Sequence, residues 1–253
     1  DWFSAMCQEV TTTRERVGVC DVSTLGKIDI RGKDSAAFLD RIYTGTFSTV
    51  PIGRVRYGLM MREDGFVFDD GTTARLGEHH YLMTTTTAGA GKVMAHLEFC
   101  HQVLWPELDV AFVSVTEQWA QFSIAGPYSR DLLRKLVDPN FDISNDAFPY
   151  MAAATVSICG GITARLFRIS FSGEMAFEIG VPNRYGDAMI RAIMAAGEEF
   201  GIAPYGLEAL SAMRIEKGHV AGLELNGQTT PRDLGLEKMV ASKKDCIGKE
   251  MSR

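Results

Sequence analysis

Residues 54–76 read RVRYGLMMREDGFVFDDGTTARL, and this stretch decides the fold class. Polar and apolar side chains alternate from Arg54 to Arg62, which is typical of a half-buried strand. Asp64-Gly65 follows, and this dipeptide supplies the positive φ angle that a tight hairpin turn needs. A second strand then runs from Phe66 to Leu76. The sequence therefore predicts an antiparallel β-hairpin at its centre.

The same pattern continues on both sides of the hairpin. Further strands are expected at residues 26–32, 81–85, 111–116, 119–124, 155–158, 163–170 and 175–181. Helices are expected at residues 3–17, from 34 onward, 89–104, after 127, 185–200 and 206–218. Runs of antiparallel strands broken by helices indicate an α+β fold rather than a doubly wound parallel sheet. We expect two intertwined lobes, residues 1–107 and residues 108–253, which interleave.

Composition excludes several classes of protein. The 253 residues are 46% hydrophobic and 23% charged, as in a globular chain with a core, which excludes disordered and collagen-like proteins. A net charge of -6 without a basic run disfavours nucleic-acid binding. The five scattered cysteines form neither a disulfide framework nor a zinc motif. With no membrane-spanning run or leader visible, we expect a cytoplasmic protein, and the sequence at both ends suggests a fragment of a longer polypeptide.

Two cofactor motifs fail when they are checked position by position. The glycine-rich run at residues 87–93 lacks a Walker motif, because Thr86 stands where its first glycine belongs and Val93 where its hydroxyl residue belongs. A dinucleotide fingerprint requires a third glycine where Met94 stands. No metal is expected, and neither flavin nor NAD is expected on this chain itself.

Two acidic positions stand out within expected strands. Asp69 and Asp70 are adjacent, so their side chains face opposite sides of the strand and one carboxylate should point toward the interior. The alternative is a structural turn or capping pair at the rim of the sheet. Glu178 lies between Phe177 and Ile179 in a strand otherwise free of charge, and is either functional or a solvent-facing residue of the alternation.

Five blocks occur in a specific order along the chain. They are Asp21-Val22-Ser23, the strand that contains Tyr57, Phe66-Val67-Phe68-Asp69-Asp70-Gly71, Ser172-Gly173-Glu174-Met175-Ala176-Phe177-Glu178 and Met213-Arg214-Ile215-Glu216-Lys217-Gly218. Together they resemble the folate-binding aminomethyltransferase family, typified by the T-protein of the glycine cleavage system. Within that family the chain is most similar to the C-terminal region of heterotetrameric sarcosine oxidase alpha subunits, from about residue 14 to 248. The resemblance implies the family's α+β folate-binding fold without its C-terminal barrel.

The resemblance also implies tetrahydrofolate as the cofactor and assigns residues to it. Asp70 matches the carboxylate beside the reactive pterin edge and is expected to be catalytic. Glu178 matches the pterin anchor, and Tyr57 the aromatic wall; Arg214 and Thr86 complete the expected binding residues. A carboxylate can accept two parallel hydrogen bonds from a pterin N–H and amino group.

The implied reaction traps an amine-derived one-carbon unit as 5,10-methylenetetrahydrofolate. In the sarcosine oxidase branch the unit is an iminium made by other subunits, whereas in the T-protein it is carried on a lipoyl arm. The T-protein's Gly-Tyr-Thr-Gly block is Ser170-Phe171-Ser172-Gly173 here, and its Gly-Gln-Asp-Met block is Gly222-Leu223-Glu224-Leu225. These departures favour the oxidase branch. The alternatives are a free-standing aminomethyltransferase and a non-catalytic folate-binding domain.

Overall fold

The computed structural model describes residues 1–252, and they group into two compact units. Unit 1 comprises residues 1–23 and 117–219, and unit 2 comprises residues 24–116 together with the described residues from 220 onward. This grouping differs from the expected division at residues 1–107 and 108–253. The reason is that the first strand of the chain, β1 (Gly18–Asp21), pairs with strands at residues 119–125 and 203–204, which the expected division assigns to the other lobe.

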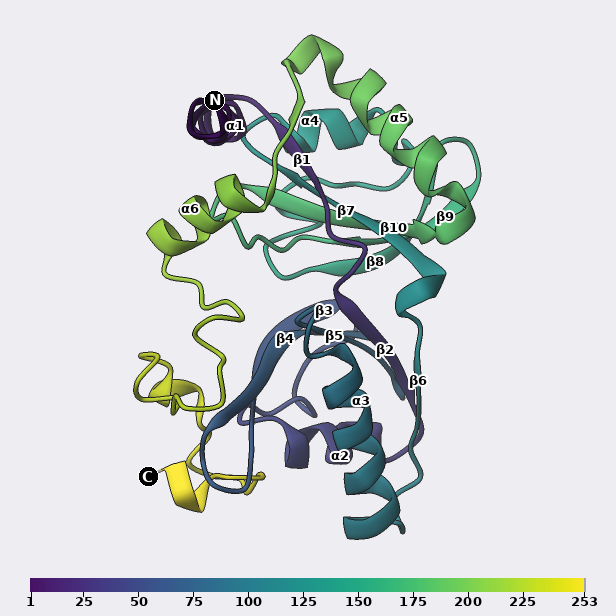
Figure 1. The fold of residues 1–253 in the computed structure, drawn as a ribbon. Helices are drawn as coiled ribbons and strands as arrows, with labels where there is room; N and C mark the ends of the chain where they lie inside the picture. Colours follow the sequence, from purple (N-terminus) through teal and green to yellow (C-terminus); the bar gives the residue numbers. More distant parts are fainter. Residues whose placement is uncertain (253) are drawn as a thin grey trace. The chain divides into compact units, whose positions relative to one another are not determined.

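Unit 1 contains a six-stranded sheet in the order β11-β1-β7-β10-β9-β8 (Figure 1). Its other strands are β7 (Trp119–Ala125), β8 (Ala153–Ile158), β9 (Ile162–Phe167), β10 (Ala176–Pro182) and β11 (Ala203–Pro204). The helices of this unit are α1 (Trp2–Glu15), α4 (Ser129–Arg134), α5 (Gly186–Gly197) and α6 (Leu207–Lys217), with short 3₁₀ turns at Asn183–Tyr185 and Glu198–Phe200. All strand pairs are antiparallel except β1 with β11.

The two faces of the unit 1 sheet differ in character because side chains alternate along each strand. Phe122 and Ile124 of β7 belong to the main core, together with Ile193 of α5. The β7 residues that alternate with Phe122 and Ile124 point to the opposite face. On that face Ala125 packs in a smaller cluster with Met213 of α6. This second face also carries the polar side chains described below.

Unit 2 contains a five-stranded antiparallel sheet in the order β3-β4-β5-β2-β6. Its strands are β2 (Gly26–Arg31), β3 (Arg54–Met61), β4 (Val67–Gly77), β5 (His80–Thr85) and β6 (Ala111–Ser114). Its helices are α2 (Ser35–Ile42) and α3 (Ala90–Phe99), which continues into a π-helical turn at Cys100–Leu104. Its 3₁₀ turns are Glu237–Met239 and Glu250–Ser252. A further 3₁₀ turn, Thr116–Gln118, begins at the last residue of the 24–116 segment of unit 2 and continues into unit 1.

The central hairpin and the α+β class are confirmed. Tyr57 of β3 is paired with Thr72 of β4, and Gly65 adopts the positive φ of 84° that the turn requires. Neither sheet closes into a barrel within residues 1–252. In the same part of the chain, no helix combines the length and the apolar character needed to cross a bilayer. Strands β1 and β11 were not predicted, because each is too short to show a full alternation.

Candidate functional site

The residues expected to form the site fall into two groups, one in each unit. Asp69, Asp70, Tyr57 and Thr86 belong to unit 2. Glu178 and Arg214 belong to unit 1. Each group is therefore described within its own sheet.

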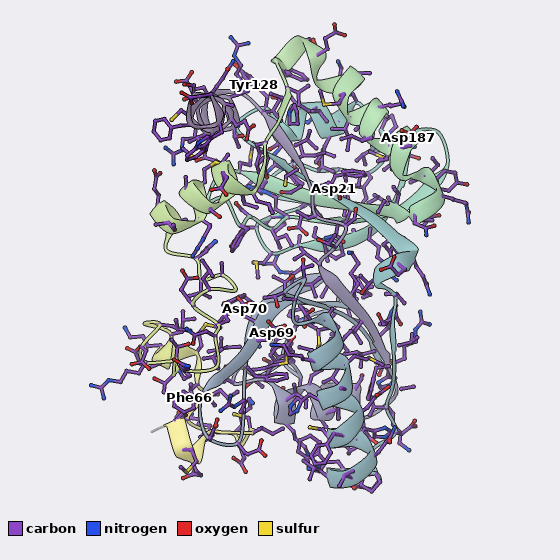
Figure 2. All side chains as sticks on the ribbon, in the orientation of Figure 1. Asp21, Phe66, Asp69, Asp70, Tyr128 and Asp187 are labelled. Atoms are coloured by element: carbon purple, nitrogen blue, oxygen red, sulfur yellow. The ribbon has the colours of Figure 1, made fainter. Side chains whose placement is uncertain are left out.

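Asp70 lies on β4 beside Tyr57 of the neighbouring strand (Figure 2 labels Asp70). Leu59 is the direct partner of Asp70 and Thr72 that of Tyr57, so the tyrosine and the aspartate form a diagonal cross-strand pair. The Tyr57 hydroxyl donates a hydrogen bond to Asp70 Oδ2 at 2.6 Å. Only 9% of the Asp70 surface is exposed. The carboxyl is thus largely withdrawn from water but keeps one strong donor.

Burial shifts the protonation of this pair. It raises the pKa of the Asp70 carboxyl from 3.8 to about 6; the Tyr57 hydrogen bond opposes the rise and the charge of Asp69 adds to it. Burial, and next the charge of Asp70, also raise the pKa of the Tyr57 phenol far above its ordinary range, so the phenol remains a donor. Asp70 can therefore take up or release a proton close to neutral pH.

Asp69 has a different set of partners. Its Oδ1 accepts a hydrogen bond from the Thr86 hydroxyl at 2.7 Å, and its Oδ2 accepts one from the Thr86 N–H at 3.3 Å. Thr86 Oγ1 in turn accepts a hydrogen bond from the N–H of Gly89, the N-cap residue of α3, at 3.0 Å. Asp69 and Thr86 thus link β4 to the start of a helix. Burial raises the pKa of Asp69 as well.

The sequence predicts one inward carboxylate, and the structure buries both aspartates. The two side chains do take opposite directions, but 2% of Asp69 and 9% of Asp70 is exposed. Strand alternation predicts the directions, while the covering of both faces depends on segments distant in sequence. Asp69 fits the alternative of a structural capping residue, because it links β4 to the start of α3. Asp70 differs from Asp69, because its hydrogen-bond partner is Tyr57.

Glu178 lies on β10 with 7% of its surface exposed, so the solvent-facing alternative is wrong. Its Oε2 accepts a hydrogen bond from Gln121 Nε2 of β7 at 2.5 Å. Ser123 is the direct cross-strand partner of Glu178, and its hydroxyl accepts a hydrogen bond from the Tyr205 hydroxyl at 3.3 Å. The glutamate therefore belongs to a buried polar group on the sheet face opposite the main core.

Arg214 is buried on α6, where its guanidinium Nη1 donates to the carbonyl of His219 at 3.2 Å.

Burial, and then the charges of Asp21 and Glu178, raise the pKa of the Cys20 thiol to about 11. Burial raises the pKa of Tyr205 above its ordinary range, with the Cys20 and Glu178 charges adding to it. Both groups are therefore neutral near pH 7.

Three residues of this group, Gln121, Ser123 and Tyr205, were not predicted from the sequence. Gln121 occupies a polar position in the alternation of β7, but only the pairing of β7 with β10 shows that it reaches Glu178. The register is non-local information, and a single sequence does not contain it.

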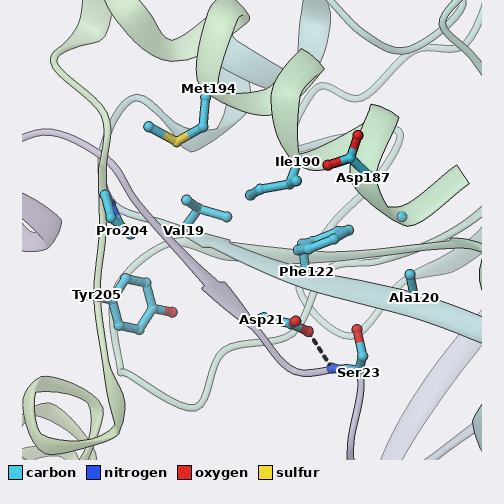
Figure 3. A pocket seen from close by; sticks show the side chains of 11 residues that line it. Val19, Asp21, Ser23, Ala120, Phe122, Asp187, Ile190, Met194, Pro204 and Tyr205 are labelled. Carbon is cyan, nitrogen blue, oxygen red and sulfur yellow. Dashed lines mark hydrogen bonds between the residues drawn. The ribbon is translucent and has the colours of Figure 1, made fainter.

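A pocket of about 540 Å³ opens elsewhere in unit 1 (Figure 3). It is lined by Val19 and Asp21 of β1, by Phe122 of β7 and by Ile190 and Met194 of α5, among others. Phe122 is on the core face of the sheet, whereas the neighbouring Gln121 and Ser123 point to the other face. The pocket therefore opens on the core face, and it meets the Glu178 group at Tyr205, whose hydroxyl donates to Ser123. Among residues 1–252, no cluster of three or more His, Cys, Asp or Glu side chains is arranged to hold a metal ion.

Comparison with known proteins identifies the family. Residues 1–244 match the GCVT N-terminal domain. The chain belongs to this family. The chain is similar to sarcosine oxidase subunit alpha of Rhizobium meliloti (strain 1021). The two are 56% identical over 252 residues, which is 99% of this chain and 25% of that protein.

Two further comparisons extend the family assignment. An aminomethyltransferase of Geobacillus sp. (strain WCH70) is 33% identical over 252 residues, which covers 98% of this chain and 67% of that protein. The solved aminomethyltransferase T of Bartonella henselae superposes with a TM-score of 0.84 at 22% identity, over 97% of this chain and 64% of that one. The fold expected from the resemblance is thereby confirmed. The chain spans about a quarter of the length of the sarcosine oxidase alpha subunits that it matches.

Proposed function

We propose that this GCVT domain binds tetrahydrofolate and traps an amine-derived one-carbon unit as 5,10-methylenetetrahydrofolate, as part of a sarcosine oxidase-like alpha subunit. The higher identity to the sarcosine oxidase subunit than to the aminomethyltransferase supports this branch of the family. Bound tetrahydrofolate would supply the nitrogen nucleophiles that capture the one-carbon unit. The protein's own contribution lies in holding the ligand and in moving a proton.

The observation that carries the proposal is the state of Asp70. A general base works best when its pKa is near the operating pH, and burial brings the pKa of Asp70 to about 6. The Tyr57 hydroxyl fixes one carboxylate oxygen at 2.6 Å and leaves the other for a reacting group. We assign to Asp70 the uptake of the proton that a folate nitrogen loses during attack.

Glu178 fits the anchoring of a pterin. Its carboxylate is buried and accepts a hydrogen bond from Gln121, and a carboxylate can accept hydrogen bonds at about four positions in all. A pterin N–H and amino group are two parallel donors of the matching kind. In a buried setting such charge-assisted hydrogen bonds distinguish a pterin strongly from a ring that lacks the donors.

The remaining expected residues take supporting roles in the proposal. The ring of half-buried Tyr57 offers an apolar face to the pterin, in addition to its hydroxyl contact with Asp70. Arg214 contributes a permanent positive charge for Glu178 or for a carboxylate of the folate tail. The Thr86 hydroxyl both donates to Asp69 and accepts from Gly89, so any contact with folate uses its remaining lone pair.

The partners follow from the same proposal. Other subunits of an oxidase complex would supply the iminium, and neither flavin nor NAD would bind to this chain itself. We place the protein in the cytoplasm, with no nucleic-acid or membrane partner.

The experiment is an Asp70→Asn substitution in the full-length alpha subunit, assembled with its partner subunits. Tetrahydrofolate binding should be nearly unchanged, because an amide retains the shape of the carboxylate. The formation of 5,10-methylenetetrahydrofolate should fall by about 10²–10⁴-fold, the usual contribution of a positioned acid–base group. Mass spectrometry of the folate pool measures this yield.

Asp69→Asn is the matched control. The Asp69 carboxylate accepts a hydrogen bond from Thr86, so its substitution should reduce transfer much less. Equal losses in the two variants would show that Asp70 is not the acid–base group. Full turnover in Asp70→Asn would favour the non-catalytic folate-binding alternative. A requirement for a lipoyl-carried substrate would favour the free-standing aminomethyltransferase.

A further inference from the structure

Gln121 is a buried amide that donates a hydrogen bond to a carboxylate. Only 2% of its surface is exposed, and its Nε2 donates to Glu178 Oε2 at 2.5 Å. Directly opposite Gln121 on β10 is Gly180, while Glu178 is one diagonal step away. Because Gly180 has no side chain, the glutamine has room to lean along the strand toward the glutamate.

The backbone of Gln121 is held by the Asp21-Val22-Ser23 block, which has no assigned role so far. The Ser23 N–H donates to Asp21 Oδ1 at 2.9 Å, which closes a turn (Figure 3). The Ser23 hydroxyl then bridges the backbone of Gln121: it accepts from the N–H at 2.9 Å and donates to the carbonyl at 3.3 Å. The Val22 N–H donates to the same carbonyl at 2.9 Å. The turn thus fixes the backbone position of Gln121, from which the side chain reaches Glu178.

Two titratable groups near this pair, Cys20 and Tyr205, are neutral near pH 7. Cys20 of β1 and Tyr205 both have pKa values raised by burial, so neither carries charge between pH 5.5 and 8.5. The charges of Glu9 on α1 and of Asp21 also act on Cys20. These groups are the same in the wild type and in variants of Gln121, so a comparison between the two isolates the glutamine.

We propose that Gln121 is a positioning residue for Glu178. Its amide donates to one carboxylate oxygen and so sets the orientation in which the group meets the N–H donors of a ligand. The turn at residues 21–23 acts through Gln121. This inference rests on the proposed function, because it makes tetrahydrofolate the ligand that the carboxylate receives.

The test is calorimetric titration of the chain with tetrahydrofolate at several pH values between 5.5 and 8.5. Gln121→Met removes the donor, and affinity should fall roughly 10-fold at every pH, since a hydrogen bond to a charged group is lost. Ser23→Ala should cause a smaller loss in the same direction.

Gln121→Glu gives a readout that a purely structural role would not produce. At low pH the two facing carboxylates share a proton, and the protonated Glu side chain donates to Glu178 as the amide did. Affinity relative to wild type should therefore be nearly normal at pH 5.5 and should fall about 10-fold or more by pH 8.5. Taking the ratio to wild type at each pH removes any dependence common to both proteins, including that of Asp70.

Gln8→Met is the matched control, because it makes the same chemical change at an exposed position on α1 and should leave affinity unchanged. A double-mutant cycle of Gln121→Met with Glu178→Met, measured by urea unfolding without ligand, should give a non-zero coupling.

The outcomes separate the two claims. If the wild-type chain does not bind tetrahydrofolate, the proposed function fails and this inference fails with it, whatever the cycle shows. If the wild type binds but Gln121→Met binds equally well, or Gln121→Glu has the wild-type pH dependence, or the cycle shows no coupling, only the inference is overturned.

Discussion

Replacing Asp70 by asparagine should stabilise the protein at neutral pH but not at acidic pH. The pKa of Asp70 is about 6 in the folded protein against an ordinary value of 3.8. Below pH 3.8 the carboxyl is protonated in both states, and its contribution to stability is fully present. As the pH rises to about 6 the unfolded chain releases the proton first, so the folded state loses stability. The difference of about two pKa units is worth roughly 3 kcal/mol at 1.36 kcal/mol per unit.

Urea unfolding of wild type and Asp70→Asn, followed by circular dichroism from pH 4 to 7.5, measures this effect. The stability of the variant minus that of the wild type should rise by about 2–3 kcal/mol across this range, with most of the change between pH 4 and 6. Asp187→Asn is a suitable control, because this exposed carboxylate is paired with Arg191, which lowers its pKa. A difference between Asp70→Asn and wild type that is flat with pH would refute the idea that Asp70 is a buried carboxyl with a raised pKa.

Three further predictions concern the same two sheets. Tyr57→Phe removes the donor to Asp70 Oδ2, so the pKa of Asp70 should rise by about one further unit; carboxyl ¹³C NMR titration measures it, and a fall would contradict the assignment. Cys20, whose pKa is about 11, should react with iodoacetamide at pH 7.5 at least 10-fold more slowly than exposed Cys7, as peptide mass spectrometry can show. Gly58→Ala should destabilise the protein by about 1–3 kcal/mol in urea unfolding, because an added Cβ would lie 2.5 Å from a buried tyrosine ring.

The sequence predicts those features that depend on neighbouring residues. The central hairpin follows from alternation and an Asp-Gly turn, and both are properties of a short segment. The grouping into units depends on the pairing of β1 with β7 and β11, which joins residues far apart in the chain. A division by sequence position therefore placed the boundary elsewhere.

The same distinction applies to the candidate site. Alternation predicts that Asp69 and Asp70 diverge, but the roles of the two carboxylates follow from Thr86 and Tyr57, which other segments supply. The sequence alone left the burial of Glu178 open. Its partner Gln121 is on a different strand, and only the register brings the two together.

The most direct test of the account is the affinity of the chain for tetrahydrofolate with and without the Glu178 carboxylate. In Glu178→Gln the side-chain oxygen should turn toward the Gln121 donor, so the new amide N–H₂ group would face the donors of the pterin. Binding measured by calorimetry should weaken by roughly 2–4 kcal/mol. The melting temperature should change little, because the two side chains have nearly equal volumes. Wild-type affinity in Glu178→Gln, or no binding by the wild-type chain, would contradict the account.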